Sequence, residues 1–187
     1  MSLEQLKSQI ANDFGTPAAV IDLDRVERNI GRVQKLCDQA GVANRPHIKT
    51  HKSPVIARMQ IAAGATGITC QKLGEAEVMA DGGIDDILIS YNLLGEAKIG
   101  RLGALLKRVT VTAAADNATV VAALAQAGKI AGRPLGVVIE CDTGRKRACS
   151  PSRLASMGNF AARIVAWARA GSSAGSIGFG VGAGMGR

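Results

Sequence analysis

The chain has 187 residues, of which 47% are hydrophobic and 3% aromatic, and its formal net charge is +8. This length suits one ordinary domain, whereas a closed eightfold β/α barrel typically needs about 250 residues. So few aromatic side chains argue against a surface that binds nucleic acid by stacking. No apolar run is long enough to span a bilayer, so we expect a cytoplasmic protein that binds neither nucleic acid nor membrane.

The positive charge is unevenly distributed along the chain. Every Asp and Glu lies at or before Asp142, whereas four arginines follow Arg147. Up to Arg147 the balance of basic and acidic residues is ordinary for a globular protein. The cysteines lie far apart within apolar patterns, which favours reduced core thiols over disulfides or a zinc site. They are Cys37, Cys70, Cys141 and Cys149.

After an opening helix expected over residues 3–12, short β-branched runs alternate with amphipathic stretches. This alternation is typical of βαβ units and predicts a parallel sheet with right-handed crossovers. The expected strands are residues 18–22, 46–49, 67–70, 86–90, 109–112 and 135–140. The expected helices between them have apolar residues at three- and four-residue spacing. They are residues 25–40, 54–63, 74–80, 97–106 and 117–130.

Residues 45–52 read Arg-Pro-His-Ile-Lys-Thr-His-Lys and contain both histidines of the protein. The proline keeps the residue before it extended, and strand alternation then places His47 and Lys49 on one face. Lys49 stands where the strand would end. The nearby cations Arg45 and Lys52 are expected to favour its neutral, nucleophilic form. From the residues alone, a basic, solvated strand end is an equal alternative.

This segment resembles the cofactor-lysine motif of pyridoxal-phosphate enzymes with the alanine-racemase-like barrel. It is most similar to D-threonine aldolases and eukaryotic-type D-serine dehydratases, whose motif reads Arg-Pro-His-x-Lys-x-His-Lys. The likeness extends, in the same order, to residues 16–24, 69–77 and 139–147. It implies an α/β fold, namely a partial (β/α)8 TIM barrel of about five barrel strands over residues 1–147. The strand at 18–22 would belong to a second, β-rich domain.

The resemblance also implies roles for residues near the predicted barrel mouth. Lys49 matches the lysine that binds pyridoxal 5'-phosphate and exchanges the proton at the substrate Cα. His47 would hydrogen-bond near the cofactor ring or orient Lys49, with a merely solvated histidine as the alternative. Gln71 would contact the cofactor ring on the side of its phenolic oxygen. The alternative is a polar residue that simply precedes the following helix.

Two further cofactor-binding residues follow the last predicted strand. Arg147 matches the arginine of the family's Asp-x-Gly-x-x-Arg pattern, which lies against the pyridine nitrogen. A guanidinium does not release a proton, so this nitrogen would stay unprotonated. Asp142 would position the same loop. A generic basic turn is the alternative for this segment, which also contains Arg145 and Lys146.

Polar residues also follow two of the expected strands. Asn92 follows the strand expected at 86–90 and is a further candidate at the barrel mouth. Glu75 and Glu77 are interpreted as acids that stabilise the first turn of a helix.

The resemblance implies a pyridoxal-phosphate-dependent lyase that cleaves D-β-hydroxy amino acids, most like a D-threonine aldolase. A D-serine dehydratase, an amino-acid racemase and a non-enzymatic cofactor-binding protein are the alternatives. The expected substrate is a small D-amino acid, and full-length relatives are expected to be homodimers that use a divalent metal bound near their C-terminus. Because both histidines lie near Lys49, no metal site is assigned in this chain.

The sequence changes character after Arg147. Residues 148–170 still predict a helix, but a Gly, Ser and Ala run from Gly171 cannot build a core. The family pattern stops at Ala148, which favours a frameshifted or truncated product over a natural flexible tail. We therefore expect little lyase activity from this chain, and an aggregation-prone edge at the strand over 135–140.

Overall fold

The computed structural model describes residues 1–142 and 150–151. The helix expected over 148–170, the glycine-rich run and Arg147 lie outside the described residues. Asp142 belongs to a short strand, β5 (Cys141–Asp142), which pairs in parallel with β6 (Ser150–Pro151). The predicted division of the chain after residue 147 therefore stays a prediction.

A four-stranded parallel sheet forms the centre of the molecule, with strand order β1-β2-β3-β4. The strands are β1 (Ile68–Cys70), β2 (Asp86–Ile89), β3 (Thr110–Ala115) and β4 (Gly136–Ile139). Four of the predicted strands are thus confirmed, with bounds shifted by up to three residues. Thr69 lies opposite Leu88, Leu88 opposite Thr112 and Thr112 opposite Gly136. β4 is the last strand of this sheet, as expected for the strand over 135–140.

The strand expected over 46–49 is reduced to a single parallel bridge between His47 and Thr69. The Ile48 N–H donates to Thr69 O at 2.9 Å, but Ile48 O already accepts the Lys52 N–H at 2.8 Å. The chain therefore curls into a turn immediately after the bridge, and the prediction of a longer strand was wrong. Ile48 is nevertheless fully buried and fixes this segment beside β1.

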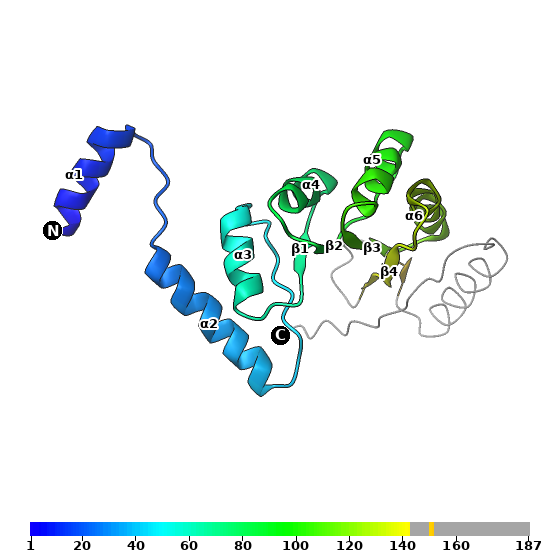
Figure 1. The fold of residues 1–187 in the computed structure, drawn as a ribbon, viewed down its shortest axis with the longest axis horizontal. Helices are drawn as coiled ribbons and strands as arrows, with labels where there is room; N and C mark the ends of the chain where they lie inside the picture. The colour runs from blue at the N-terminus through cyan, green and yellow to red at the C-terminus, as the bar shows by residue number, and fades with distance from the viewer. Residues whose placement is uncertain (143–149, 152–187) are drawn as a thin grey trace.

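Four helices lie along the sheet, as Figure 1 shows. They are α3 (Pro54–Ala62), α4 (Leu73–Asp81), α5 (Glu96–Leu106) and α6 (Ala118–Ala131). Each lies in sequence between extended segments, which gives the predicted βαβ alternation. Their inner faces and the strands form one apolar core. The largest fully buried side chains include Ile68, Ile87, Ile89, Leu102, Leu106 and Leu124.

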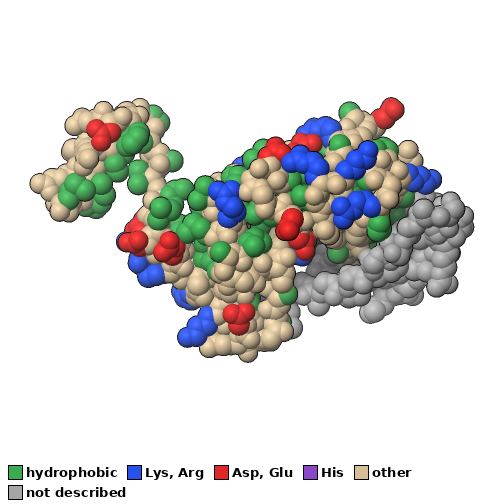
Figure 2. Space-filling view, viewed as in Figure 1, with side chains coloured by type: hydrophobic (Ala, Val, Ile, Leu, Met, Phe, Trp, Pro, Cys, Tyr) green, Lys and Arg blue, Asp and Glu red, His purple; other side chains and the backbone are tan. Residues whose placement is uncertain are grey.

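The N-terminal region consists of α1 (Leu3–Phe14) and α2 (Leu23–Gln39), joined by an extended linker. The strand expected over 18–22 is not formed. Val20 is 63% exposed and finds no strand beside it in the described chain, and Asp22 instead caps α2 by accepting the Arg25 N–H at 3.0 Å. Figure 2 shows apolar side chains on the exposed surface of α1. None of the described helices is long and apolar enough to cross a membrane.

Candidate functional site

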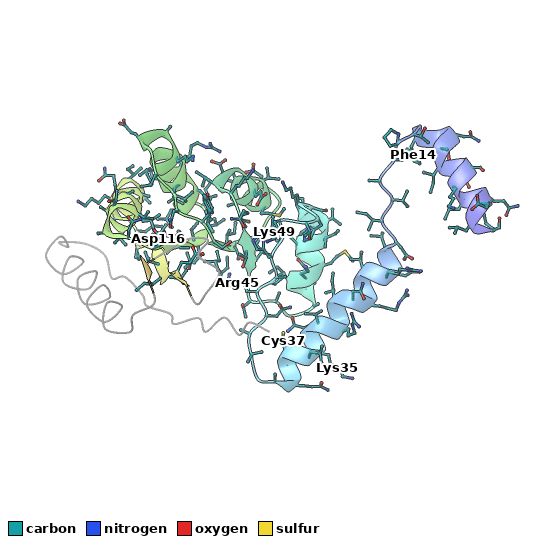
Figure 3. All side chains as sticks on the ribbon, turned by 180° about the vertical axis from the view of Figure 1, so that it is seen from behind. Phe14, Lys35, Cys37, Arg45, Lys49 and Asp116 are labelled. Atoms are coloured by element: carbon teal, nitrogen blue, oxygen red, sulfur yellow. The ribbon has the colours of Figure 1, made fainter. Side chains whose placement is uncertain are left out.

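Polar residues meet at the carboxyl edge of the parallel sheet. Because the strands run in one direction, the residues that follow their ends lie at the same edge, which is where β/α barrels place their active sites. They are Lys49 after the bridge, Gln71 after β1, Ser90 after β2, Asp116 after β3 and Glu140 after β4. Figure 3 labels Lys49 beside the sheet, well away from Phe14 at the end of α1.

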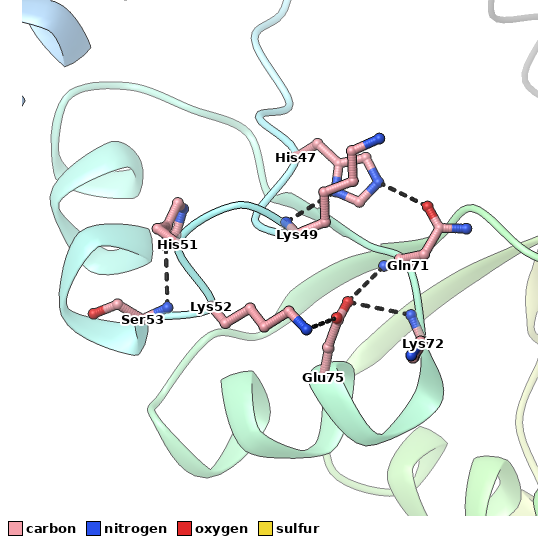
Figure 4. A network of polar contacts seen from close by, with 8 residues as sticks. All are labelled: His47, Lys49, His51, Lys52, Ser53, Gln71, Lys72 and Glu75. Carbon is pink, nitrogen blue, oxygen red and sulfur yellow. Dashed lines mark hydrogen bonds and ion pairs between the residues drawn. The ribbon is translucent and has the colours of Figure 1, made fainter. Parts of the chain in front are cut away.

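His47 is the centre of a polar network at this edge (Figure 4). Its Nδ1 accepts the Lys49 backbone N–H at 3.2 Å. In the neutral imidazole this places the proton on Nε2, which lies 3.3 Å from Gln71 Oε1 and 3.4 Å from Ser90 Oγ. The Ser90 hydroxyl in turn donates to Cys70 O at 3.4 Å. His47 therefore ties the Lys49 turn to the ends of β1 and β2.

The Lys49 side chain is exposed, and no carboxylate pairs with its amine in the described part of the chain. The two cations expected to crowd Lys49 each pair with a carboxylate. Arg45 makes two hydrogen bonds to Asp86, at 2.9 and 3.0 Å, at the amino end of β2. Lys52 pairs with Glu75, whose Oε1 lies 3.3 Å from the Lys52 Nζ. Carboxylates therefore neutralise both cations.

Glu75 connects two turns of the site through one carboxylate. Its Oε2 accepts the Gln71 N–H at 2.9 Å and the Lys72 N–H at 3.3 Å, while Oε1 faces Lys52. Burial alone would raise the pKa of Glu75, but these hydrogen bonds and the Lys52 charge outweigh it, so the pKa is lowered. The Glu75 carboxylate therefore stays ionised between the Gln71 turn and the Lys52 ammonium.

The second histidine, His51, contacts the backbone at the start of the next helix. His51 Nδ1 accepts the Ser53 N–H at 3.1 Å, directly before α3. Desolvation by burial lowers the pKa of His51. Burial, with the Glu75 charge, raises the pKa of the Cys70 thiol to about 12, as expected for an inert core cysteine.

The structure thus brings Lys49, His47 and Gln71 together, while the roles expected for them in cofactor binding stay predictions. Ser90 was missed, although its place after a buried strand next to Asn92 was a usable signal. The side chains of Asp142 and Arg147 lie outside what the structure describes. Within residues 1–142 and 150–151, no group of three or more His, Cys, Asp or Glu side chains is arranged to hold a metal ion.

Comparisons with known proteins identify the family of this chain. The sequence profile of the alanine racemase N-terminal domain matches residues 21–166. The likeness therefore continues past Ala148, and the expectation that it stops there was wrong. A D-threonine aldolase from Arthrobacter sp. is 42% identical over 132 residues, which are 71% of this chain and 35% of that protein. A D-threo-3-hydroxyaspartate dehydratase from Delftia sp. is 43% identical over 137 residues, covering 71% of this chain and 35% of that protein.

A solved structure shares the fold. The crystal structure of D-threonine aldolase from Filomicrobium marinum matches with a TM-score of 0.74 and 34% sequence identity, over 88% of this chain and 42% of that one. The expected α/β fold, a partial barrel of the alanine racemase type, is therefore confirmed. The chain spans about a third of the length of the curated relatives that it matches. It belongs to the alanine racemase N-terminal domain family.

Proposed function

We propose that this chain is the lysine-bearing part of a pyridoxal-phosphate-dependent lyase that acts on D-β-hydroxy amino acids, most like a D-threonine aldolase. The observation that carries the proposal is the exposed Lys49 at the carboxyl edge of the sheet, with its backbone held by His47. The names of the relatives support the reaction class. A dehydratase acting on the same class of substrate is the second candidate, because the Delftia relative is one.

The residues at this edge fit pyridoxal phosphate. Covalent attachment of an aromatic aldehyde needs a primary amine that is accessible and not paired with a carboxylate, and Lys49 has both properties. Gln71 and Ser90 offer neutral hydrogen-bonding groups beside it. Asn92 keeps a buried Oδ1 without a hydrogen-bond partner in the described chain, which suits an edge that receives a further polar group.

When bound, pyridoxal phosphate supplies the electron sink for negative charge at the substrate Cα. Lys49 is proposed to bind the cofactor and to accept or return the Cα proton. His47 orients the Lys49 turn and contacts Gln71. Gln71 would hydrogen-bond near the cofactor ring. By resemblance, Arg147 is proposed to lie at the pyridine nitrogen, and Asp142 to position its loop. A divalent metal and a homodimer are proposed for the full-length protein only.

Borohydride reduction in the presence of pyridoxal phosphate tests the proposal. Peptide mapping of the purified chain should find the pyridoxyl adduct on Lys49, and Lys49→Ala should abolish it. Lys107→Ala is the matched control, because Lys107 is an exposed lysine at the end of α5, outside the site. An adduct on Lys72 in the native chain, with Lys49 unmodified, would contradict the assignment.

A further inference from the structure

Two lysines lie three residues apart on the turn that follows the His47 bridge, and their surroundings differ. Lys49 is exposed, and no carboxylate pairs with it in the described part of the chain. The Lys52 side chain is 58% exposed, but its Nζ lies 3.3 Å from Oε1 of Glu75. Figure 4 shows the two side chains on different sides of the turn, Lys49 beside His47 and Lys52 beside Glu75. Only one of the two amines is thus left unengaged.

The backbone conformation of Lys52 contributes to the difference between the two lysines. Lys52 has φ +50°, and it is the one non-glycine residue with a positive φ among the residues that the structure describes. Residues other than Gly, Asn and Asp rarely adopt this left-handed backbone conformation, and where it persists the surrounding contacts stabilise it. Here the Lys52 N–H donates to Ile48 O at 2.8 Å, and the ammonium faces Glu75. The unusual conformation therefore turns Lys52 toward the carboxylate.

Glu75 does more than cap a helix. An acid in the first turn of α4 is expected to accept the N–H of the residue before the helix, as Glu75 does from Lys72. However, the same carboxylate also accepts the Gln71 N–H at 2.9 Å and pairs with Lys52 from a different turn. It thereby joins the turn that carries Lys49 to the turn that carries Gln71.

We infer that Glu75 is a positioning residue that makes Lys49, rather than Lys52, the reactive amine of the site. By engaging Lys52, it removes the nearest competing nucleophile, and by holding the Gln71 N–H it fixes the turn whose side chain meets His47. The inference rests on the proposed function, in which an aldehyde cofactor selects one lysine of this turn. It assigns Glu75 no contact with the cofactor.

Limited reductive methylation with formaldehyde and cyanoborohydride tests the selection without any cofactor. Peptide mapping of the native chain should find Lys49 methylated faster than Lys52. Glu75→Gln keeps an oxygen that can accept the Gln71 N–H but removes the charge. It should raise the ratio of Lys52 to Lys49 methylation about two- to fivefold, the range that a partly exposed ion pair supports.

Glu77→Gln is the matched control, because Glu77 lies two residues along α4 but pairs with Arg101 on α5. It should leave the methylation ratio at the native value. An unchanged ratio in a folded Glu75→Gln protein, checked by its far-UV circular dichroism, would overturn the inference. Faster methylation of Lys52 than of Lys49 in the native chain would overturn it as well, and that measurement needs no variant.

The same proteins reduced with borohydride in the presence of pyridoxal phosphate separate this inference from the proposed function. Glu75→Gln should divert part of the pyridoxyl adduct from Lys49 to Lys52. A native chain with no adduct on either lysine would count against the proposed function, while the methylation ratio would still decide the role of Glu75. Adduct that stays wholly on Lys49 in Glu75→Gln would contradict the inference alone.

Discussion

The body formed by the sheet and α3 to α6 differs from the N-terminal arm formed by α1 and α2. Every helix of the body buries residues against the strands, whereas α1 buries none and α2 buries only Gln34. Local helix signals are present in both regions, since Ser2 and Gln5 form a complete capping box before α1. For α1, helix formation therefore does not imply packing, whereas α2 contacts α3 and its Gln34 accepts a hydrogen bond from the Asn44 side chain.

The largest expected difference between the two regions concerns the apolar core. Leu102 on α5 is fully buried, and Leu102→Ala should lower the free energy of unfolding by about 2–5 kcal/mol. Phe14 on the arm is 79% exposed, and Phe14→Ala should change the free energy of unfolding by less than about 0.5 kcal/mol. Urea unfolding followed by far-UV circular dichroism measures both. Similar losses in the two variants would mean that Phe14 packs against the body.

A smaller effect is expected where the bridge segment meets β1. A Cβ on Gly67 would lie 2.7 Å from the backbone oxygen of Asp86 and would also collide with the Arg45 guanidinium. The Arg45 side chain can move, but the Asp86 carbonyl belongs to the sheet, so Gly67→Ala should destabilise the protein by about 1–3 kcal/mol. The unfolding midpoint in urea measures this loss.

Gly100→Ala is the control for this substitution. Gly100 lies inside α5, and no atom stands within 4 Å of the Cβ it would gain. Alanine is the better helix former, so this variant should be more stable than the native chain by about 0.5–1 kcal/mol. A Gly67→Ala protein as stable as Gly100→Ala would show that Gly67 is not packed against the Asp86 carbonyl of β2.

The body was predictable from the sequence because its signals are local. β-branched runs at β2 and β4 and apolar spacing in the helices between strands are properties of adjacent residues. The two helices of the arm were predicted as well, but the strand expected between them was wrong, because Val20 and Ile21 read as a strand by the same criterion. A strand needs a partner as well as suitable residues, and the described chain offers none there. The strand expected over 46–49 is shorter for a related reason. Ile48 O accepts the Lys52 N–H and so makes no hydrogen bond to a neighbouring strand.

The site was predictable in its residue types but not in its pairings. Lys49, His47 and Gln71 were identified from motifs, and their approach follows from parallel strands that end at one edge. The partners of Arg45 and Lys52 lie 41 and 23 residues further along the chain, in other elements, so no local pattern reveals them. The neutralisation of these two cations near Lys49 was missed for this reason. Glu75 was interpreted only as a helix-terminal acid because its contact with Lys52 is likewise non-local.

The smallest predicted effect compares two helix caps. Asn117 caps α6 by accepting the Val120 N–H at 3.0 Å, and α6 packs Val120 and Leu124 into the core. Asn117→Ala should therefore lower the free energy of unfolding of the whole chain by about 1 kcal/mol. Ser2→Ala removes a comparable cap from α1, which buries nothing.

An isolated helix of 12 residues is marginally stable in water, so Ser2→Ala should reduce the helicity of α1 without moving the unfolding midpoint of the body. Far-UV circular dichroism in the native baseline reports the first change, and faster amide exchange confined to α1 would locate it. The urea midpoint reports the second. If Ser2→Ala lowered this midpoint as much as Asn117→Ala, α1 would be packed against the body in solution, and the contrast between the two regions would not hold.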